Sequence, residues 1–341
     1  MITISVCMIV KNEEAQLAAC LDSLKPIADE IIIVDTGSSD RTKEIAARYT
    51  DRIYDFPWID DFAAARNFAF SKAAKEYIYT ADADEVIDEN NIRLFRRVKE
   101  LLPPETEIVQ MYYLNLMEEN TAYNSKRELR PKLFRRLRTF EWINPVHETV
   151  RLDPVIYNSD IEIMHLAKGS HAKRDFAAFQ KALRRGMRLD KVLHSMYAKE
   201  LFIAGDRDDL AEAVPFFEQS LSDPSRTEDE HREARCVLAR AYRTGGDTAG
   251  FFRLCLRDVI AVPCSEMCGE IGHFFYDSGS YDEALCWLND AIFETEAVIT
   301  ILSQGKENLS LLADCYEKTG DPENAEKYRK MAEEWELPET V

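Results

Sequence analysis

The stretch EYIYTADADE, residues 76–85, places a run of apolar and aromatic residues directly before a group of carboxylates. The run YIYTA is typical of a short buried strand. Asp82, Asp84 and Glu85 follow it directly or within a few residues. Two interpretations are open for this acidic loop: an acidic turn at the surface, or a site that receives a positive group such as a divalent cation.

Similar strand patterns precede this stretch, and helical patterns separate them. The apolar runs TISVCMIV (3–10) and EIIIVD (30–35) predict two further strands. Helical spacing of apolar residues is present in EEAQLAACLDSL (13–24), SDRTKEIAARY (39–49) and DFAAARNFAFSKAA (61–74). We expect Ser39 or Asp40 to cap the second of these helices. Short Ile- and Val-rich strands that alternate with helices predict a parallel sheet with helices on both faces.

The pattern changes further along the chain, which predicts three parts. Residues 1–170 form the first predicted domain, and RDFAAFQKALRRGMRLDKV (174–192) predicts a long helix, so that 171–194 is expected to be a linking helix. Residues 195–341 have a helical pattern throughout, with four segments that align as predicted helix, turn and helix. Gly205, Gly245, Gly279 and Gly320 lie in the four turns, which resembles tetratricopeptide repeats with their period of about 34 residues.

Charge and composition exclude several classes of protein. Residues 195–341 hold 31 acidic and 14 basic residues, net −17, whereas residues 1–194 hold 31 and 29, net −2, which together give the total of −19. Duplex nucleic acid is therefore not an expected partner. The sequence has no apolar run of about 20 residues and no signal-peptide pattern at its start, and its eight cysteines are scattered, so we expect a cytoplasmic protein.

The acidic loop has a counterpart at the end of the second predicted strand. VDTGSSD, residues 34–40, places Asp35 where that strand ends. Ligands of open α/β sheets bind at the carboxyl ends of the strands. Carboxylates there can hold Mg²⁺ or Mn²⁺, which in turn bind phosphate oxygens. An Asp-x-Asp pair alone leaves the surface-turn interpretation equally open.

Four motifs that occur in a particular order along the chain favour the interpretation of the acidic loop as a ligand site. CMIVKNEE, IIIVDTGSSDRT, ARN and YIYTADADE, within about residues 1–170, resemble the family 2 glycosyltransferases, and more closely their small cytosolic branch with C-terminal tetratricopeptide repeats. That branch includes enzymes of surface-polysaccharide assembly and sublancin-type peptide S-glycosyltransferases. The resemblance implies an α/β fold of the GT-A (Rossmann-like) type that binds a nucleotide sugar, followed by an all-α helical-repeat domain. It also implies metal-dependent, inverting transfer of a sugar from a UDP-sugar to a peptide or glycan.

The resemblance also implies roles for individual residues. The donor is expected to contact Lys11, Asn12, Glu13, Glu14, Asp35, Arg66, Asp82 and Arg130. Asp84 is the expected ligand of Mn²⁺ or Mg²⁺, with Asp82 and His165 as further candidates. Arg130 belongs to the basic run KRELRPKLFRRLR, 126–138, which equally fits the outer face of a strand pair. A surface arginine for Arg66 and a structural histidine for His165 are the other interpretations.

The general base is expected in INPVHETV, residues 143–150. A carboxylate base would deprotonate the acceptor as it attacks the sugar from the face opposite the diphosphate. Glu148 is the first candidate and His147 the second, while a surface His–Glu pair beside a turn is the alternative. A thiol acceptor would make a weaker base sufficient.

Two other functions fit parts of the sequence. The first is a tetratricopeptide scaffold protein with an inactive glycosyltransferase domain, but Asp35, Asp82, Asp84 and Glu148 are all present. The second is a nucleotidyltransferase, although no glycine-rich phosphate loop follows the first strand. The acidic repeats are expected to bind an acceptor, with a basic peptide favoured by charge, or to form a homodimer.

Overall fold

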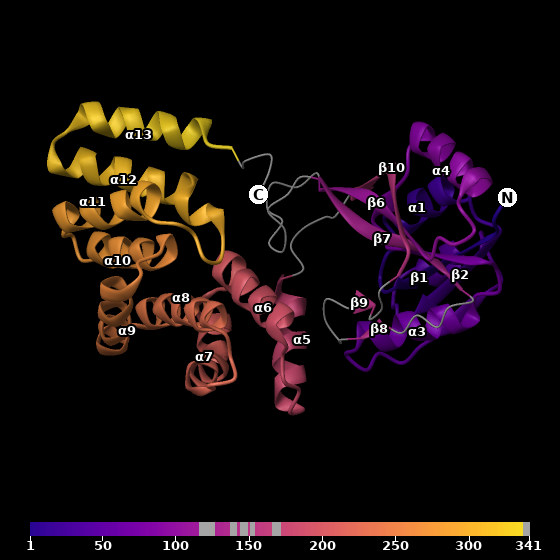
Figure 1. Ribbon diagram of the computed structural model, residues 1–341, viewed down its shortest axis with the longest axis horizontal. Coiled ribbons are helices and arrows are strands. Elements are labelled where there is room, and N and C mark those ends of the chain that lie inside the picture. The colour runs from indigo at the N-terminus through magenta and orange to yellow at the C-terminus, as the bar shows by residue number, and fades with distance from the viewer. Residues whose placement is uncertain (116–126, 137–141, 144–148, 151–153, 166–171, 337–341) are drawn as a thin grey trace. The chain divides into compact units, whose positions relative to one another are not determined.

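The computed structural model describes residues 1–115, 127–136, 142–143, 149–150, 154–165 and 172–336. They form two compact units, which divide between strand β10 and helix α5 (Figure 1). The first unit contains all the described strands, and the second is built from helices. The predicted α/β class, followed by an all-α region, is therefore confirmed.

The first unit is built on an eight-stranded mixed sheet with the order β3-β2-β1-β4-β7-β6-β10-β5. Its strands are β1 (Ile4–Val10), β2 (Glu30–Asp35), β3 (Ile53–Asp55), β4 (Tyr77–Ala81), β5 (Glu85–Val86), β6 (Ile108–Asn115), β7 (Arg127–Arg135) and β10 (Ile156–His165). The first four are parallel to one another, as predicted, whereas β7 runs antiparallel to both of its neighbours. β10 is parallel to β6 and antiparallel to β5. A separate pair joins β8 (Trp142–Ile143) to β9 (Thr149–Val150).

Helices cover both faces of this sheet because successive strand residues point to opposite sides. Along β1, Met8 packs with α1 (Leu17–Leu24), α2 (Thr42–Ala46) and α4 (Glu89–Leu101) in one apolar cluster. Its neighbour Cys7 faces the other side, where α3 (Phe62–Lys72) packs. The expected sheet with helices on two sides is thus present in the first unit.

The predicted cap of α2 is wrong. The helix begins at Thr42, and Arg41 occupies the N-cap position without a side-chain cap. Asp40 instead accepts hydrogen bonds from the backbone N–H of Thr42 and of Glu14, at 3.0 and 3.1 Å. Its carboxylate therefore joins two loops of the sheet edge, and the sequence pattern alone does not separate this contact from a helix cap.

The second unit contains the helices α5 (Ala172–Arg184), α6 (Lys191–Ala204), α7 (Arg207–Ser222), α8 (Glu228–Gly245), α9 (Thr248–Ala261), α10 (Ser265–Asp277), α11 (Tyr281–Asn289), α12 (Lys306–Thr319) and α13 (Pro322–Glu334), together with a π-helical turn (Asp290–Glu294) and a 3₁₀ turn (Ile301–Gln304). The four aligned segments correspond to the pairs α6/α7, α8/α9, α10/α11 and α12/α13 (Figure 1). The first helix of each pair contacts the first helix of the next. This stacking is the arrangement of tetratricopeptide-like repeats.

The predicted linking helix is not continuous. α5 ends at Arg184, and Gly186 adopts a left-handed conformation with φ of +79°, which stops the helix. Asp190 then caps α6 by accepting a hydrogen bond from the backbone N–H of Leu193 at 2.9 Å. In the second pair, Gly246 rather than Gly245 takes the left-handed turn, with φ of +82°. The predicted boundaries of the three parts remain predictions.

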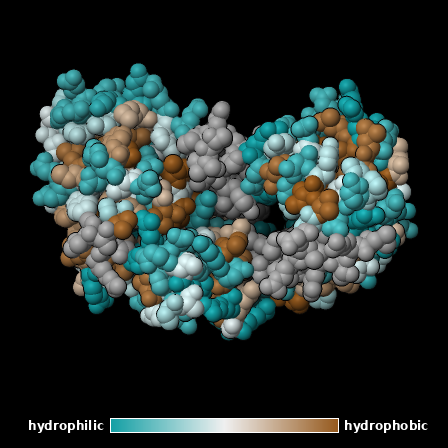
Figure 2. Space-filling model, viewed as in Figure 1, coloured by the Kyte–Doolittle hydropathy of each residue, from teal (hydrophilic) through white to brown (hydrophobic). Residues whose placement is uncertain are grey.

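Hydrophilic residues cover most of the visible face of each unit, with apolar residues in several small areas (Figure 2). Within the described part of the chain, no helix combines the length and the apolar character that crossing a bilayer requires.

Candidate functional site

The loops that follow β1 and β2 are joined by hydrogen bonds at the carboxyl end of the sheet. Asn12 has φ of +57°, a conformation that asparagine tolerates better than most residues. Its backbone N–H donates to Ser38 Oγ at 2.9 Å, and its Oδ1 accepts from the backbone N–H of Ser39 at 2.8 Å. Glu14 Oε2 accepts from Arg41 Nε at 3.2 Å. These two predicted donor residues therefore shape the loop that starts at Asp35.

The other two residues of this motif differ in their surroundings. The backbone N–H of Glu13 donates to Thr42 Oγ1 at 2.7 Å, which ties it to the same loop. Lys11 is exposed. Of the four predicted residues after β1, Glu13 is thus the one that is partly buried, and the other three are exposed.

Asp35 is the last residue of β2 and is only 2% exposed. Its Oδ2 accepts hydrogen bonds from the backbone N–H groups of Gly37 and Ser38, both at 3.0 Å. Its Oδ1 is buried and has no hydrogen-bond partner among the described residues. A buried carboxylate oxygen without a donor is costly, so this atom is available to accept from a ligand.

The acidic loop at the end of β4 is held by cations from two other elements. Arg66 of α3 donates to Thr80 Oγ1 at 2.7 Å and to Asp82 Oδ1 at 3.1 Å. Lys132 Nζ of β7 lies 3.9 Å from Asp82 Oδ2. Burial raises the pKa of Asp82, but the charges of Arg66 and Lys132 outweigh it and hold the pKa well below its usual range. Thr80 is therefore the second partner of Arg66 in this contact.

Glu85, the last residue of this loop, forms a buried ion pair with Lys132. Glu85 is 1% exposed and Lys132 is 5% exposed, and Lys132 Nζ donates to Glu85 Oε1. Burial raises the pKa of Glu85 to about 7, against the lowering effect of Lys132. Glu85 Oε2 is buried without a hydrogen-bond partner among the described residues.

Asp84 meets His165 where β5 pairs with β10. His165 lies opposite Glu85 in this antiparallel pair, and its Nε2 is 3.0 Å from Asp84 Oδ2. The ring of Tyr113 lies beside the imidazole, with 5.1 Å between centroids. Asp84 Oδ1 is buried and lacks a hydrogen-bond partner within the described residues. The structure thus brings together the predicted residues Asp84 and His165, which are 81 positions apart.

Arg130 and Lys132 approach the site from β7. Arg130 Nε donates to Glu128, and its guanidinium lies 3.9 Å from the ring centroid of Tyr113. Lys132 lies 5.4 Å from the same centroid. Sequence reasoning singled out Arg130 and missed Lys132, although residues two apart on a strand point to the same face. The predicted residues Glu148 and His147 lie outside the described residues.

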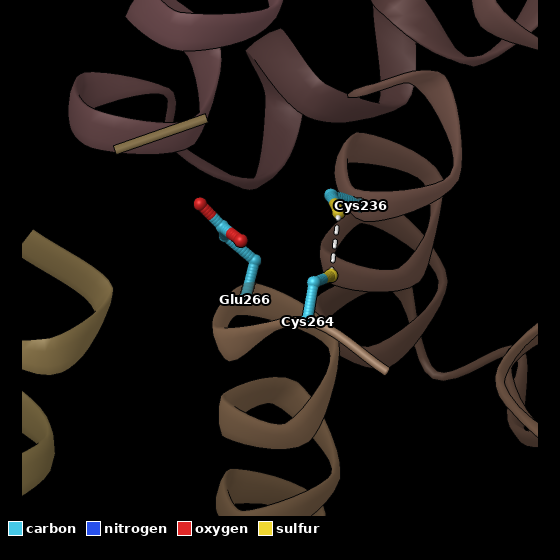
Figure 3. A group of neighbouring side chains, drawn as sticks. All are labelled: Cys236, Cys264 and Glu266. Carbon is cyan, nitrogen blue, oxygen red and sulfur yellow. Dashed lines mark hydrogen bonds between the residues drawn. The ribbon is translucent and has the colours of Figure 1, made fainter. Parts of the chain in front are cut away.

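A second group of candidate metal ligands lies in the helical unit, at Cys236, Cys264 and Glu266 (Figure 3). The two sulfurs face each other 3.5 Å apart. The Glu266 carboxylate instead accepts hydrogen bonds from three consecutive backbone N–H groups, those of Val298, Ile299 and Thr300. Because these donors already satisfy the carboxylate, packing and backbone hydrogen bonding account for this group.

The similarity to known proteins lies mainly in the first unit. Residues 5–151 match the family model described as glycosyl transferase family 2. A TPR repeat-containing protein of Synechococcus elongatus is 35% identical over 150 residues, which cover 44% of this chain and 36% of that protein. The SPbeta prophage-derived glycosyltransferase SunS of Bacillus subtilis is 30% identical over 169 residues, which cover 47% of this chain and 36% of SunS. The chain spans about half the length of its curated relatives or less.

Among solved structures, glucosyl-3-phosphoglycerate synthase of Mycobacterium tuberculosis, in complex with Mg²⁺ and UDP, aligns with a TM-score of 0.40 at 16% identity. That alignment covers 55% of this chain and 81% of the synthase.

The first unit carries two carboxylate loops at the carboxyl ends of parallel strands. Residues 5–151 of this unit match the model of glycosyl transferase family 2, and named glycosyltransferases are among its relatives. The helical unit that follows has the stacked pairs of tetratricopeptide-like repeats.

Proposed function

We propose that the chain is a metal-dependent, inverting glycosyltransferase that moves a sugar from a UDP-sugar to a peptide or glycan acceptor. One observation carries this proposal: two buried carboxylate oxygens without partners among the described residues, Asp35 Oδ1 and Asp84 Oδ1. Asp35 ends β2 and Asp84 follows β4, and these parallel strands lie on either side of β1, so both carboxylates belong to the same edge of the sheet. Both atoms need a donor or a cation, and a nucleotide diphosphate with its metal provides both.

The donor side of the site is proposed to be built around Asp35. Its Oδ2 is fixed by two backbone N–H groups, so its free Oδ1 is oriented to accept from uracil or ribose. The loop contacts of Asn12 and Glu14 hold this region in shape, and the exposed Lys11, which follows β1, is proposed to contact the donor. Asp82, oriented by Arg66, is proposed to contact the ribose.

The metal is proposed to bind Asp84 and His165. A carboxylate oxygen and an imidazole nitrogen fit Mn²⁺, and a buried free Oδ1 on Asp84 leaves a ligand position to fill. Asp82 is less suited to this role because Arg66 and Lys132 already balance its charge. When bound, the cation would supply positive charge to the diphosphate leaving group.

For the chemical step we propose direct displacement with Glu148 as the base and His147 as the second candidate. The base must reach the acceptor proton within about 2.6–3.2 Å. Arg130, stacked on Tyr113, is proposed as a fixed cation on the side of the leaving group.

The repeats are proposed to bind the acceptor. Their charge favours a basic peptide, which would be attracted at long range and less so at high salt. A second copy of the chain is the other partner that the exposed helix faces could bind.

The test is a thermal-shift titration with UDP, GDP and CDP, each with and without Mn²⁺. A ligand that binds only the folded protein raises its melting temperature. We expect a shift with UDP that requires Mn²⁺, that is lost in Asp84→Asn and that is weakened in Asp35→Asn. Asp55→Asn, which removes an exposed ion pair with Lys43, is the matched control and should behave like wild type. No shift with any nucleotide would refute the proposal and favour a scaffold with an inactive domain.

A further inference from the structure

Lys132 is buried to a degree that is rare for lysine. It is 5% exposed, and a buried ammonium is stable only when it is paired and hydrogen-bonded. Its Nζ donates to Glu85 Oε1 and lies 3.9 Å from Asp82 Oδ2. In the same basic run, Arg127 pairs with Glu162, and Arg135 donates a hydrogen bond to the backbone oxygen of Pro104.

The ammonium of Lys132 lies close to two of the three carboxylates of the acidic loop. The loop, residues 82–85, holds the carboxylates of Asp82, Asp84 and Glu85. Arg66 pairs with Asp82 from the α3 side, and Lys132 reaches both Asp82 and Glu85 from β7. Asp84 is the remaining carboxylate, and its described partner is His165.

We propose that Lys132 is a positioning residue for the nucleotide site. It holds Asp82 and Glu85 so that the acidic loop keeps its binding form and Asp84 is left to face the metal and the diphosphate. This inference rests on the proposed transferase function, because it assigns Lys132 a role in binding the donor.

The topology of the sheet explains how a lysine of β7 reaches the carboxylates of the acidic loop. That strand runs antiparallel between β4 and β6, and its last residues, Leu133–Arg135, pair with β4. Pairing of Tyr79 with Leu133 brings the preceding residue, Lys132, to the level of the acidic loop. Without the ammonium, Asp82 would lose one of its cationic partners and Glu85 would lose its hydrogen-bond donor, so part of the free energy of ligand binding would be spent on ordering the loop.

The experiment measures the dissociation constant for UDP at saturating Mn²⁺ by calorimetry, together with the melting temperature of the ligand-free protein. The variants are Lys132→Met, which keeps the length and removes the charge, and Lys132→Arg, which keeps the charge. We expect Lys132→Met to bind UDP about tenfold more weakly or worse, and Lys132→Arg to recover most of the loss. Lys43→Met, which removes an exposed Lys–Asp pair of the same domain, is the control and should bind as wild type does.

The two readouts separate a positioning role from a purely structural one. A folded Lys132→Met with a lower melting temperature and unchanged UDP affinity would overturn the inference. If Lys132→Met does not fold, the double variant Lys132→Gln/Glu85→Gln replaces the buried ion pair by two amides, and UDP affinity equal to wild type would overturn the inference there. Absence of Mn²⁺-dependent UDP binding by the wild type would instead refute the proposed function.

Discussion

Glu270 of α10 offers a quantitative test of how the repeats are held together. It is 1% exposed, and its two oxygens accept from Arg240 Nε at 2.6 Å and Arg243 Nε at 2.7 Å, both on α8. Burial raises the pKa of Glu270, but the two guanidinium groups outweigh it and lower the pKa to about 2 from an ordinary value of 4.5. A difference of about 2.5 pKa units corresponds to about 3 kcal/mol of stability at neutral pH.

We therefore expect Glu270→Gln to lower the free energy of unfolding of the helical unit by about 3 kcal/mol at pH 7. The substitution keeps the shape but removes the charge and places an amide N–H₂ against an arginine donor. The pKa is lower in the folded state, so this stability is present above about pH 4.5 and is lost as the pH falls towards 2. The variant should accordingly lose less stability than the wild type over that range.

The assay is urea unfolding followed by helical circular dichroism at pH 7 and at several values between pH 5 and 3. Asp277→Asn is the matched control, because Asp277 pairs with the same Arg243 at 3.3 Å but its side chain is 62% exposed. We expect the control to cost less than about 1 kcal/mol. Equal effects of the two substitutions, or an unchanged pH dependence in Glu270→Gln, would refute the reasoning.

Three further predictions follow from single contacts. Arg66→Met should weaken Mn²⁺-dependent UDP binding about tenfold or more, because it leaves Asp82 without its 3.1 Å partner; unchanged affinity by calorimetry would contradict the role of Arg66. Asp61→Ala should destabilise the first unit by about 1 kcal/mol, because Asp61 Oδ1 caps α3 by accepting from Ala64 N at 2.9 Å; thermal unfolding checks this, and no change would show that the cap is dispensable. Cys286 should react with a thiol reagent before the other seven cysteines, which are buried; mass mapping that finds an earlier site would contradict the packing.

The sequence predicted β1, β2 and β4 because these strands are short, apolar and largely buried, a pattern that local composition encodes, whereas it did not predict the antiparallel course of β7. The helix pairs were predictable for a related reason, since each repeat has its own turn and its own apolar spacing. The break at Gly186 was missed because basic and apolar residues continue the helical spacing on both sides of it.

The site was predictable only in part. Asp35, Asp82 and Asp84 follow predicted strands, so their place at one edge of the sheet could be inferred from strand order. Lys132 could not be separated from six other basic residues of its run, because its burial depends on β7 running antiparallel between β4 and β6. The partnership of Arg66 with Thr80 and Asp82 likewise depends on how α3 packs on the sheet, which no local pattern reports.

The most direct test of the account is release of UDP from UDP-sugars, measured with a coupled assay in the presence and absence of Mn²⁺. The donors tested are UDP-glucose, UDP-galactose and their N-acetyl forms, which shows which sugar is used. Each donor is assayed with wild type, Asp84→Asn and the Asp55→Asn control, which tests the role of the metal ligand. The account predicts Mn²⁺-dependent release from at least one donor by wild type and control, and a loss of at least about a hundredfold in Asp84→Asn. Release that is equal in wild type and Asp84→Asn, or independent of Mn²⁺, would contradict it.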